Sequence, residues 1–253
     1  MGYDYLLLDA DGTVLDFDKA ERTALIAALK QFSVDPTEET IADYHRINKA
    51  LWEKLERGEL TRDRLSVLRF EQLGHLHPGA CAEMAPVYME QLSRCAFFLP
   101  GAEDFLLKAS KLCSIAIVTN GLTRVQRGRL KGCNMSRFSR VFVISQELGV
   151  SKPDALIAKA ALEGLDCTDP ARALVAGDSV SADIMLARNA GLRSCLMFSS
   201  SPLADYCTDT YDGLLSLLGG KKTHAYRSFR QNQCEIFGLL LQSGQVFDSH
   251  AVM

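Results

Sequence analysis

From residue 102 to residue 198, short apolar runs alternate with segments whose apolar residues recur at helical spacing. Apolar runs of four or five residues are typical of buried strands, and the intervening segments are long enough to form crossover helices. Such an alternation places strands in parallel, because each helix returns the chain to the same edge of the sheet. We therefore expect an α/β fold with strands at 114–118, 141–144, 173–176 and 194–198, and helices at 102–111, 122–131, 154–163 and 180–190.

Another apolar run near the N-terminus, Tyr5-Leu6-Leu7-Leu8, is followed directly by Asp9-Ala10-Asp11-Gly12-Thr13. Side chains two residues apart in an extended segment face the same way, so we expect the Asp9 and Asp11 carboxylates to converge on one reacting group. One carboxylate beside a cation can act as a nucleophile, while the other carries a proton. Taken alone, the pentapeptide is equally consistent with an Asp-rich turn.

The segment between this first strand and the strand at 114–118 is helical in pattern. It contains about a hundred residues, which is far more than one crossover helix needs. Apolar residues recur at helical spacing in four stretches between Asp18 and Phe98, and Leu99-Pro100-Gly101 provides a turn back to the sheet. We therefore expect a small helical domain inserted after the first strand.

The second and third strands of the expected sheet lead into residues that suit a phosphate group. Thr119-Asn120-Gly121 supplies a hydroxyl, an amide and a flexible backbone before a helix, and Lys152 supplies a positive charge before another helix. Each feature has an ordinary alternative, because Thr119 could be a helix cap and Lys152 a solvated surface residue.

The fourth strand leads into carboxylates. Asp178 follows it directly, and Asp183 lies five residues later. Asp178 and Asp9 could form a hard, oxygen-rich Mg²⁺ site. Asp183 could orient the ligands or Lys152 without binding the metal itself. Capping and surface charge are again the alternative for each residue alone. For the terminal residues of four consecutive strands to have this character by accident is improbable.

Composition excludes several other classes of protein. A chain of 253 residues with a net charge of −3 is not a nucleic-acid-coating protein, so we expect no nucleic acid polymer as partner. The N-terminal apolar run is too short for a signal peptide or a membrane span, which predicts a cytoplasmic protein with no membrane partner. The eight cysteines show no CxxC pair and are interpreted as free thiols.

The four polar segments, in this order, resemble the motifs of the haloacid dehalogenase (HAD) superfamily: DADGT, TNG, SKP and GDSVSAD. The resemblance implies a Rossmann-like parallel sheet core. It also implies that Asp9 is the nucleophile that forms an aspartyl-phosphate. Asp11 would be the acid/base that protonates the leaving oxygen and then activates water. Thr119 and Lys152 would bind the phosphate, with Asn120 nearby.

The same resemblance implies a Mg²⁺ cofactor held by Asp9, the backbone carbonyl of Asp11 and Asp178, with Asp183 supporting. Asp11 also separates the phosphatases of the superfamily from its dehalogenases, which do not have Asp at this position. Dehalogenase activity is therefore a weak alternative.

The helical insertion resembles the C1 cap of the superfamily, which closes over the site and selects the leaving group. The expected domains are a core of residues 1–17 and 98–218, a cap of residues 18–97, and a C-terminal extension of residues 219–253. The extension continues beyond the point at which the superfamily fold should finish, and its sequence indicates no function.

Three segments resemble the bacterial noncanonical pyrimidine 5′-nucleotidases: residues 43–52, residues 69–71 and residues 143–153. This resemblance implies a small-molecule phosphate ester, a nucleoside monophosphate, as substrate, with Asn48, Trp52 and Arg69 as candidate specificity residues. Trp52 could stack on a base, although aromatic residues at helical spacing more often lie in a core. Many of those nucleotidases have an acidic residue where this chain has Gly12.

Two alternatives remain open from the sequence. One is a phosphosugar or phosphoglycolate phosphatase of the same superfamily, because the cap sequence does not exclude it. The other is a non-catalytic binding module that keeps the fold and contacts a partner through the cap or the extension. The sequence does not indicate the oligomeric state.

Overall fold

The computed structural model describes residues 2–74, 78–220 and 227–228. Its centre is a sheet in the order β3-β2-β1-β4-β5-β6-β7. The first six strands are parallel, and β7 runs antiparallel to β6. The strands are β1 (Tyr5–Leu8), β2 (Ser114–Thr119), β3 (Val141–Ile144), β4 (Ala173–Gly177), β5 (Arg193–Met197), β6 (Tyr206–Thr208) and β7 (Arg227–Ser228).

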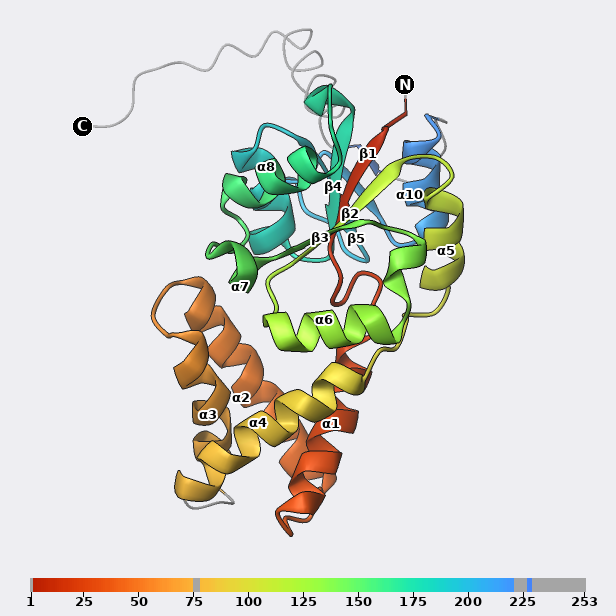
Figure 1. The fold of residues 1–253 in the computed structure, drawn as a ribbon. Coiled ribbons are helices and arrows are strands. Elements are labelled where there is room, and N and C mark those ends of the chain that lie inside the picture. The colour runs from red at the N-terminus through yellow and green to blue at the C-terminus, as the bar shows by residue number, and fades with distance from the viewer. Residues whose placement is uncertain (1, 75–77, 221–226, 229–253) are drawn as a thin grey trace, which may run out of the picture.

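Helices cover both faces of this sheet (Figure 1). Leu6 and Leu8 of β1 pack into the core on one face, and Leu7 packs into the core on the other. Both faces are thus buried, which explains why the strand is apolar without alternation. One face carries α5 (Ala102–Ala109), α6 (Thr123–Gly132) and α10 (Tyr211–Leu218), and the other carries α8 (Ala155–Gly164) and α9 (Met185–Asn189).

The predicted strands and most predicted helices of the core are confirmed, but residues 180–190 do not form one α-helix. A π-helical turn, Val180–Ile184, precedes α9. The Asp183 side chain folds back there and accepts a hydrogen bond from the Ser179 amide. Such turns are frequent at functional sites. The short elements α7 (Ser145–Leu148), β6 and β7 were not expected from the sequence.

Between β1 and α5, the described residues form four helices with a hydrophobic core of their own. Tyr44, Phe70 and Tyr88 form an aromatic cluster in it, with ring centroids 5.5–5.6 Å apart. In Figure 1 these helices lie beyond the carboxyl edge of the sheet, below it in the view. They are α1 (Phe17–Gln31), α2 (Glu38–Glu56), α3 (Arg62–Leu73) and α4 (Pro78–Arg94).

The two connections between these helices and the sheet lie side by side. Leu15 and Phe98 form an antiparallel bridge, and the Asp16 amide donates to the Phe97 carbonyl at 2.9 Å. Asp16 also caps α1 by accepting from the Lys19 amide. The paired connections form the junction between the helical insertion and the sheet.

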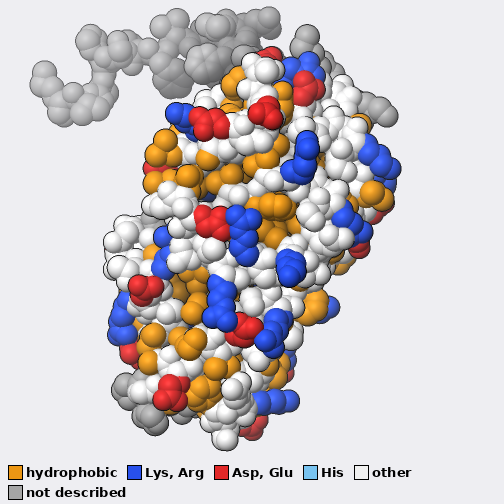
Figure 2. Space-filling view, in the orientation of Figure 1, with side chains coloured by type: hydrophobic (Ala, Val, Ile, Leu, Met, Phe, Trp, Pro, Cys, Tyr) orange, Lys and Arg blue, Asp and Glu red, His pale blue; other side chains and the backbone are white. Residues whose placement is uncertain are grey.

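Apart from residues 219–220 and 227–228, the C-terminal extension expected at 219–253 lies outside the described residues, as does Cys234. Cys95, Cys113, Cys133, Cys167 and Cys195 are free thiols. No described helix is both long enough and apolar enough to cross a bilayer. On the face shown in Figure 2, Lys and Arg side chains are interspersed with Asp and Glu side chains.

Candidate active site

The carboxyl ends of the parallel strands form one wall of a cavity of about 240 Å³, and the helical insertion forms the other. Ligands of open α/β sheets bind at this edge. The predicted residues on the cavity wall are Asp9, Asp11, Trp52, Arg69, Thr119, Asn120, Lys152, Asp178 and Asp183. Residues separated by up to 174 positions in the sequence thus meet at one site.

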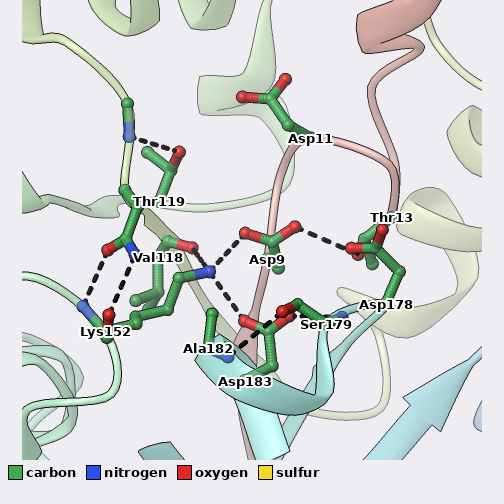
Figure 3. Close-up of polar contacts among 12 residues, drawn as sticks. Asp9, Asp11, Thr13, Val118, Thr119, Lys152, Asp178, Ser179, Ala182 and Asp183 are labelled. Carbon is green, nitrogen blue, oxygen red and sulfur yellow. Dashed lines mark hydrogen bonds and ion pairs between the residues drawn. The ribbon is translucent and has the colours of Figure 1, made fainter. Parts of the chain in front are cut away.

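Lys152 is the centre of a buried ion-pair network. Its ammonium donates to Asp9 Oδ1 at 2.5 Å, to Asp183 Oδ1 at 2.7 Å and to the Val118 carbonyl at 3.2 Å. All three of its protons therefore have acceptors. Figure 3 shows Lys152 reaching between the two carboxylates from the opposite side of the site. The network holds Asp9 in one orientation, with Oδ2 directed toward Thr13.

Thr13 and Asp178 complete the acidic side of the site. The Thr13 hydroxyl donates to Asp9 Oδ2 at 3.1 Å and to Asp178 Oδ1 at 3.0 Å (Figure 3). A hydroxyl has a single proton, so it satisfies only one of these oxygens at a time. Carboxylate oxygens of Asp9, Asp178 and Asp183 lie within 4.8 Å of one another. This donor set fits Mg²⁺, which binds oxygen ligands.

The electrostatics of the cluster follow from burial and charge. Burial raises the pKa of Asp9 above its ordinary value, while the charge of Lys152 acts in the opposite direction. Burial and the Asp9 charge raise the pKa of Asp178 to about 6. Burial alone would lower the pKa of Lys152, but Asp183 and Asp9 raise it above its ordinary value. Lys152 therefore stays protonated, and an added cation near Asp9 and Asp178 is favourable.

Asp11 is turned away from Asp9 in this structure, so their convergence on one reacting group stays a prediction. The Asp11 carboxylate points away from Asp9, and no dashed contact joins it to the other labelled residues (Figure 3). Instead it forms an ion pair with Arg129 and accepts from Gln126 Nε2 at 2.5 Å. Both partners lie on α6, so contacts to this helix override the same-side alternation of an extended segment. Asp11 still lines the cavity.

Thr119 ends β2 and Asn120 follows it, but their side chains have different surroundings. The Thr119 hydroxyl accepts from the Gly121 amide at 3.2 Å and from Gln126 at 3.0 Å, which leaves its own proton for a ligand oxygen. The Asn120 side chain pairs with the Lys152 backbone, at 3.0 Å to the carbonyl and 2.7 Å from the amide. Asn120 therefore fixes the loop that carries Lys152.

Of the three candidate specificity residues, two line the cavity and one does not. Trp52 of α2 and Arg69 of α3 line the cavity. Asn48 is buried behind Arg69, at 3.4 Å from Arg69 Nη1, and is not among the described residues of the cavity wall. Because Asn48 and Trp52 are one helical turn apart, sequence spacing did not distinguish them.

Comparison with known proteins identifies the family. A family model described as haloacid dehalogenase-like hydrolase matches residues 3–191. The chain belongs to the haloacid dehalogenase-like hydrolases. The resemblance expected from the four motifs is thereby confirmed, and with it the α/β fold of the HAD hydrolases.

Several proteins similar to this HAD hydrolase have a named activity or a solved structure. It is 33% identical to the pyrimidine 5′-nucleotidase YjjG of Escherichia coli, over 77% of this chain and 86% of that protein. It is 34% identical to the pyrimidine 5′-nucleotidase PynA of Streptococcus pneumoniae, over 76% and 82%. A crystal structure of the putative HAD-hydrolase YfnB of Bacillus subtilis, bound to magnesium, matches with a TM-score of 0.80, 28% identity, and coverage of 86% of this chain and 99% of that one.

Sequence reasoning missed three residues that contact the predicted site of this HAD hydrolase. They are Thr13, which contacts two site carboxylates, and Gln126 and Arg129, which hold Asp11. Gln126 and Arg129 are almost fully buried, at 2% and 0% exposure. Their three-residue spacing places them on one face of α6, together with Val125 and Leu130. Polar side chains on an otherwise apolar helix face were the available signal.

Proposed function

We propose that this HAD hydrolase removes the phosphate of nucleoside 5′-monophosphates, with a preference for pyrimidine nucleotides. The observation that carries the proposal is a single cavity lined both by Asp9, Thr119 and Lys152 and by Trp52 and Arg69. The first group suits a phosphate, and the second suits a planar polar ring. The names of YjjG and PynA support the same substrate class.

We assign the nucleophile role to Asp9. Its carboxylate attacks phosphorus, a bond forms between Asp9 and the phosphoryl group, and the bond to the nucleoside oxygen breaks. Lys152 and Thr119 supply positive charge and a donor proton at the phosphoryl oxygens. We assign to Asp11 the proton donation to the leaving oxygen and then the proton abstraction from the water that releases phosphate.

Mg²⁺ is the proposed cofactor, with Asp9, Asp178 and the Asp11 carbonyl as ligands. When bound, it supplies positive charge that offsets the charge of the phosphoryl oxygens. Asp183 suits a supporting role, because its Oδ1 accepts from Lys152 and its Oδ2 from the Ser179 amide. In this proposal the core of residues 1–17 and 98–218 carries the chemistry, and the cap of residues 18–97 selects the leaving group.

The proposal is tested by phosphate release from UMP, dUMP, dTMP, ribose 5-phosphate and phosphoglycolate, with Mg²⁺ and with EDTA. We expect Mg²⁺-dependent release, fastest from the pyrimidine nucleotides, and its loss in Asp9→Asn. The exposed Asp18→Asn is the matched control and should keep the wild-type rates. A preference for the non-nucleotide esters would contradict the substrate class, and release that persists in Asp9→Asn would contradict the mechanism.

A further inference from the structure

Three polar side chains are buried together inside the helical insertion, one from each of three helices. Glu21 of α1, Asn48 of α2 and Arg69 of α3 are exposed by only 2–3%. Two of them carry a charge in the hydrophobic core of the insertion, and charged residues are almost never fully buried unless they are paired. Their arrangement therefore calls for an explanation beyond packing.

Their hydrogen bonds form a chain from a residue at the surface, His45, to a residue of the cavity wall, Arg69. Glu21 Oε2 lies 2.6 Å from Nδ1 of His45, whose side chain is half-exposed. Glu21 Oε1 accepts from Asn48 Nδ2 at 2.6 Å. Because the amide nitrogen of Asn48 faces the Glu21 carboxylate, its oxygen Oδ1 faces Arg69 and accepts from Nη1 at 3.4 Å. Glu21 thus sets the orientation of the Asn48 amide, and Asn48 orients the guanidinium.

The third donor group of Arg69 has no acceptor within the described part of the chain. Nε donates to the Ser66 carbonyl at 3.2 Å, and the guanidinium lies over the Tyr88 ring at 4.6 Å. Nη2 is buried, and no described residue accepts a hydrogen bond from it. A buried donor without a partner is costly. Arg69 also lines the cavity that holds Asp9 and Lys152.

The surroundings indicate which ligand atom would meet this donor. Arg69 can only donate, so the ligand must offer an acceptor. The charge of Glu21 lies one side chain behind Arg69 and offsets the guanidinium charge, which favours a neutral acceptor over a carboxylate. The neighbouring cavity wall contains Phe17, Trp52 and Met89, which suit a flat, partly apolar ring.

We propose that Arg69 Nη2 binds a ring carbonyl oxygen of the nucleobase, and that Glu21 and Asn48 are positioning residues for Arg69. The inference rests on the proposed nucleotidase function and adds to it the group that recognises the base. The keto oxygen of a pyrimidine is such an acceptor, while the phosphate occupies the Lys152 side of the same cavity. The cap then selects the substrate by a hydrogen bond that ribose 5-phosphate cannot form.

The test compares kcat/KM for UMP and for ribose 5-phosphate in wild type and in Arg69→Met. The expected result is a loss of roughly 10- to 100-fold in the UMP to ribose 5-phosphate ratio, the effect of removing a charged hydrogen bond. Arg69→Lys keeps the charge without the planar donor geometry, so it should also lower the ratio of kcat/KM for UMP to that for ribose 5-phosphate. Equal losses on both substrates in both variants would overturn the inference. A wild type that hydrolyses ribose 5-phosphate but not UMP would instead overturn the proposed function itself.

The positioning role is tested by a double-mutant cycle. Glu21→Gln should lower the UMP to ribose 5-phosphate ratio in wild type, because a neutral amide no longer fixes the Asn48 orientation. In the Arg69→Met background the same change should have no further effect on the ratio, since residues that act through one another are not additive. The exposed Glu39→Gln serves as the matched control. Additive effects of Glu21→Gln and Arg69→Met would overturn the positioning role.

Discussion

Asp9 and Asp178 have similar chemistry but different surroundings. Asp9 is buried against Lys152, whereas Asp178 faces the cavity next to Gly12. Gly12 has a φ of +78°, and a Cβ placed on it would lie 2.5 Å from Asp178 Oδ2. An acidic side chain at this position would meet this carboxylate. The glycine therefore leaves room for Asp178 beside the first motif.

The raised pKa of Asp178 predicts how the metal site responds to pH. Because the pKa of Asp178 is about 6 in the folded protein and lower in the unfolded chain, its ionisation lowers the stability of the folded state as the pH rises toward 6. Mg²⁺ binds the ionised form, so protons compete with it below about pH 6. The increase in Tm on adding Mg²⁺ should therefore be small at about pH 5 and larger at about pH 7.5.

Thermal unfolding with and without Mg²⁺ at these two pH values measures this dependence. Asp178→Asn should remove most of the Mg²⁺-dependent increase in Tm at about pH 7.5. Asp212→Asn, in the first turn of α10, should keep that increase. The same Tm increase at both pH values in wild type would contradict the assignment of Asp178 as a ligand.

At the scale of elements, the sequence predicted the strands and helices of the core well, because both faces of the sheet are buried. Continuous apolar runs such as residues 114–118 and 141–144 were therefore unambiguous. The turn at 180–184 was not predictable from spacing, because it depends on Lys152 and Ser179, which fold the Asp183 side chain inward. The strand β6 has only three residues and pairs beside β5, so it left little pattern.

Helix α3 of the insertion contacts the core next to Lys152. Arg62, at its start, donates through Nη2 to Ser145 Oγ at 3.1 Å and to Ser151 Oγ at 2.7 Å. Ser151 immediately precedes Lys152. Arg62→Ala should therefore raise KM for the nucleotide by a few fold, roughly the effect of one or two partly buried hydrogen bonds, with a smaller change in Tm.

Steady-state kinetics of Arg62→Ala beside Arg64→Ala provides the comparison. Arg64 lies on the same helix but pairs with Glu71 within the cap. Surface ion pairs of this kind contribute little, so Arg64→Ala should keep the wild-type KM. If both variants change KM equally, the Arg62 contacts to the core have no special role in substrate binding.

At the scale of the whole molecule, the cavity divides between two parts of the chain. The strand ends and the loops after them supply Asp9, Thr119 and Lys152, and the helical insertion supplies Trp52 and Arg69. The sequence could predict that the core residues meet, because parallel strands end at one edge of a sheet. Helical spacing could not predict which residues of the insertion face them, because it does not determine how the helices dock on the core. Trp52 and Arg69 were expected only from the resemblance to the nucleotidases.

The proposed aspartyl-phosphate mechanism is tested most directly by trapping the intermediate on Asp9. The hydrolase is mixed with excess UMP and Mg²⁺ and quenched in acid within one turnover, and the peptide that contains Asp9 is then weighed by mass spectrometry. The proposed mechanism predicts the added mass of one phosphoryl group on Asp9, absent in Asp9→Asn and with EDTA. Hydrolysis of UMP with no phosphorylated Asp9 peptide, or with equal turnover by Asp9→Asn, would contradict it.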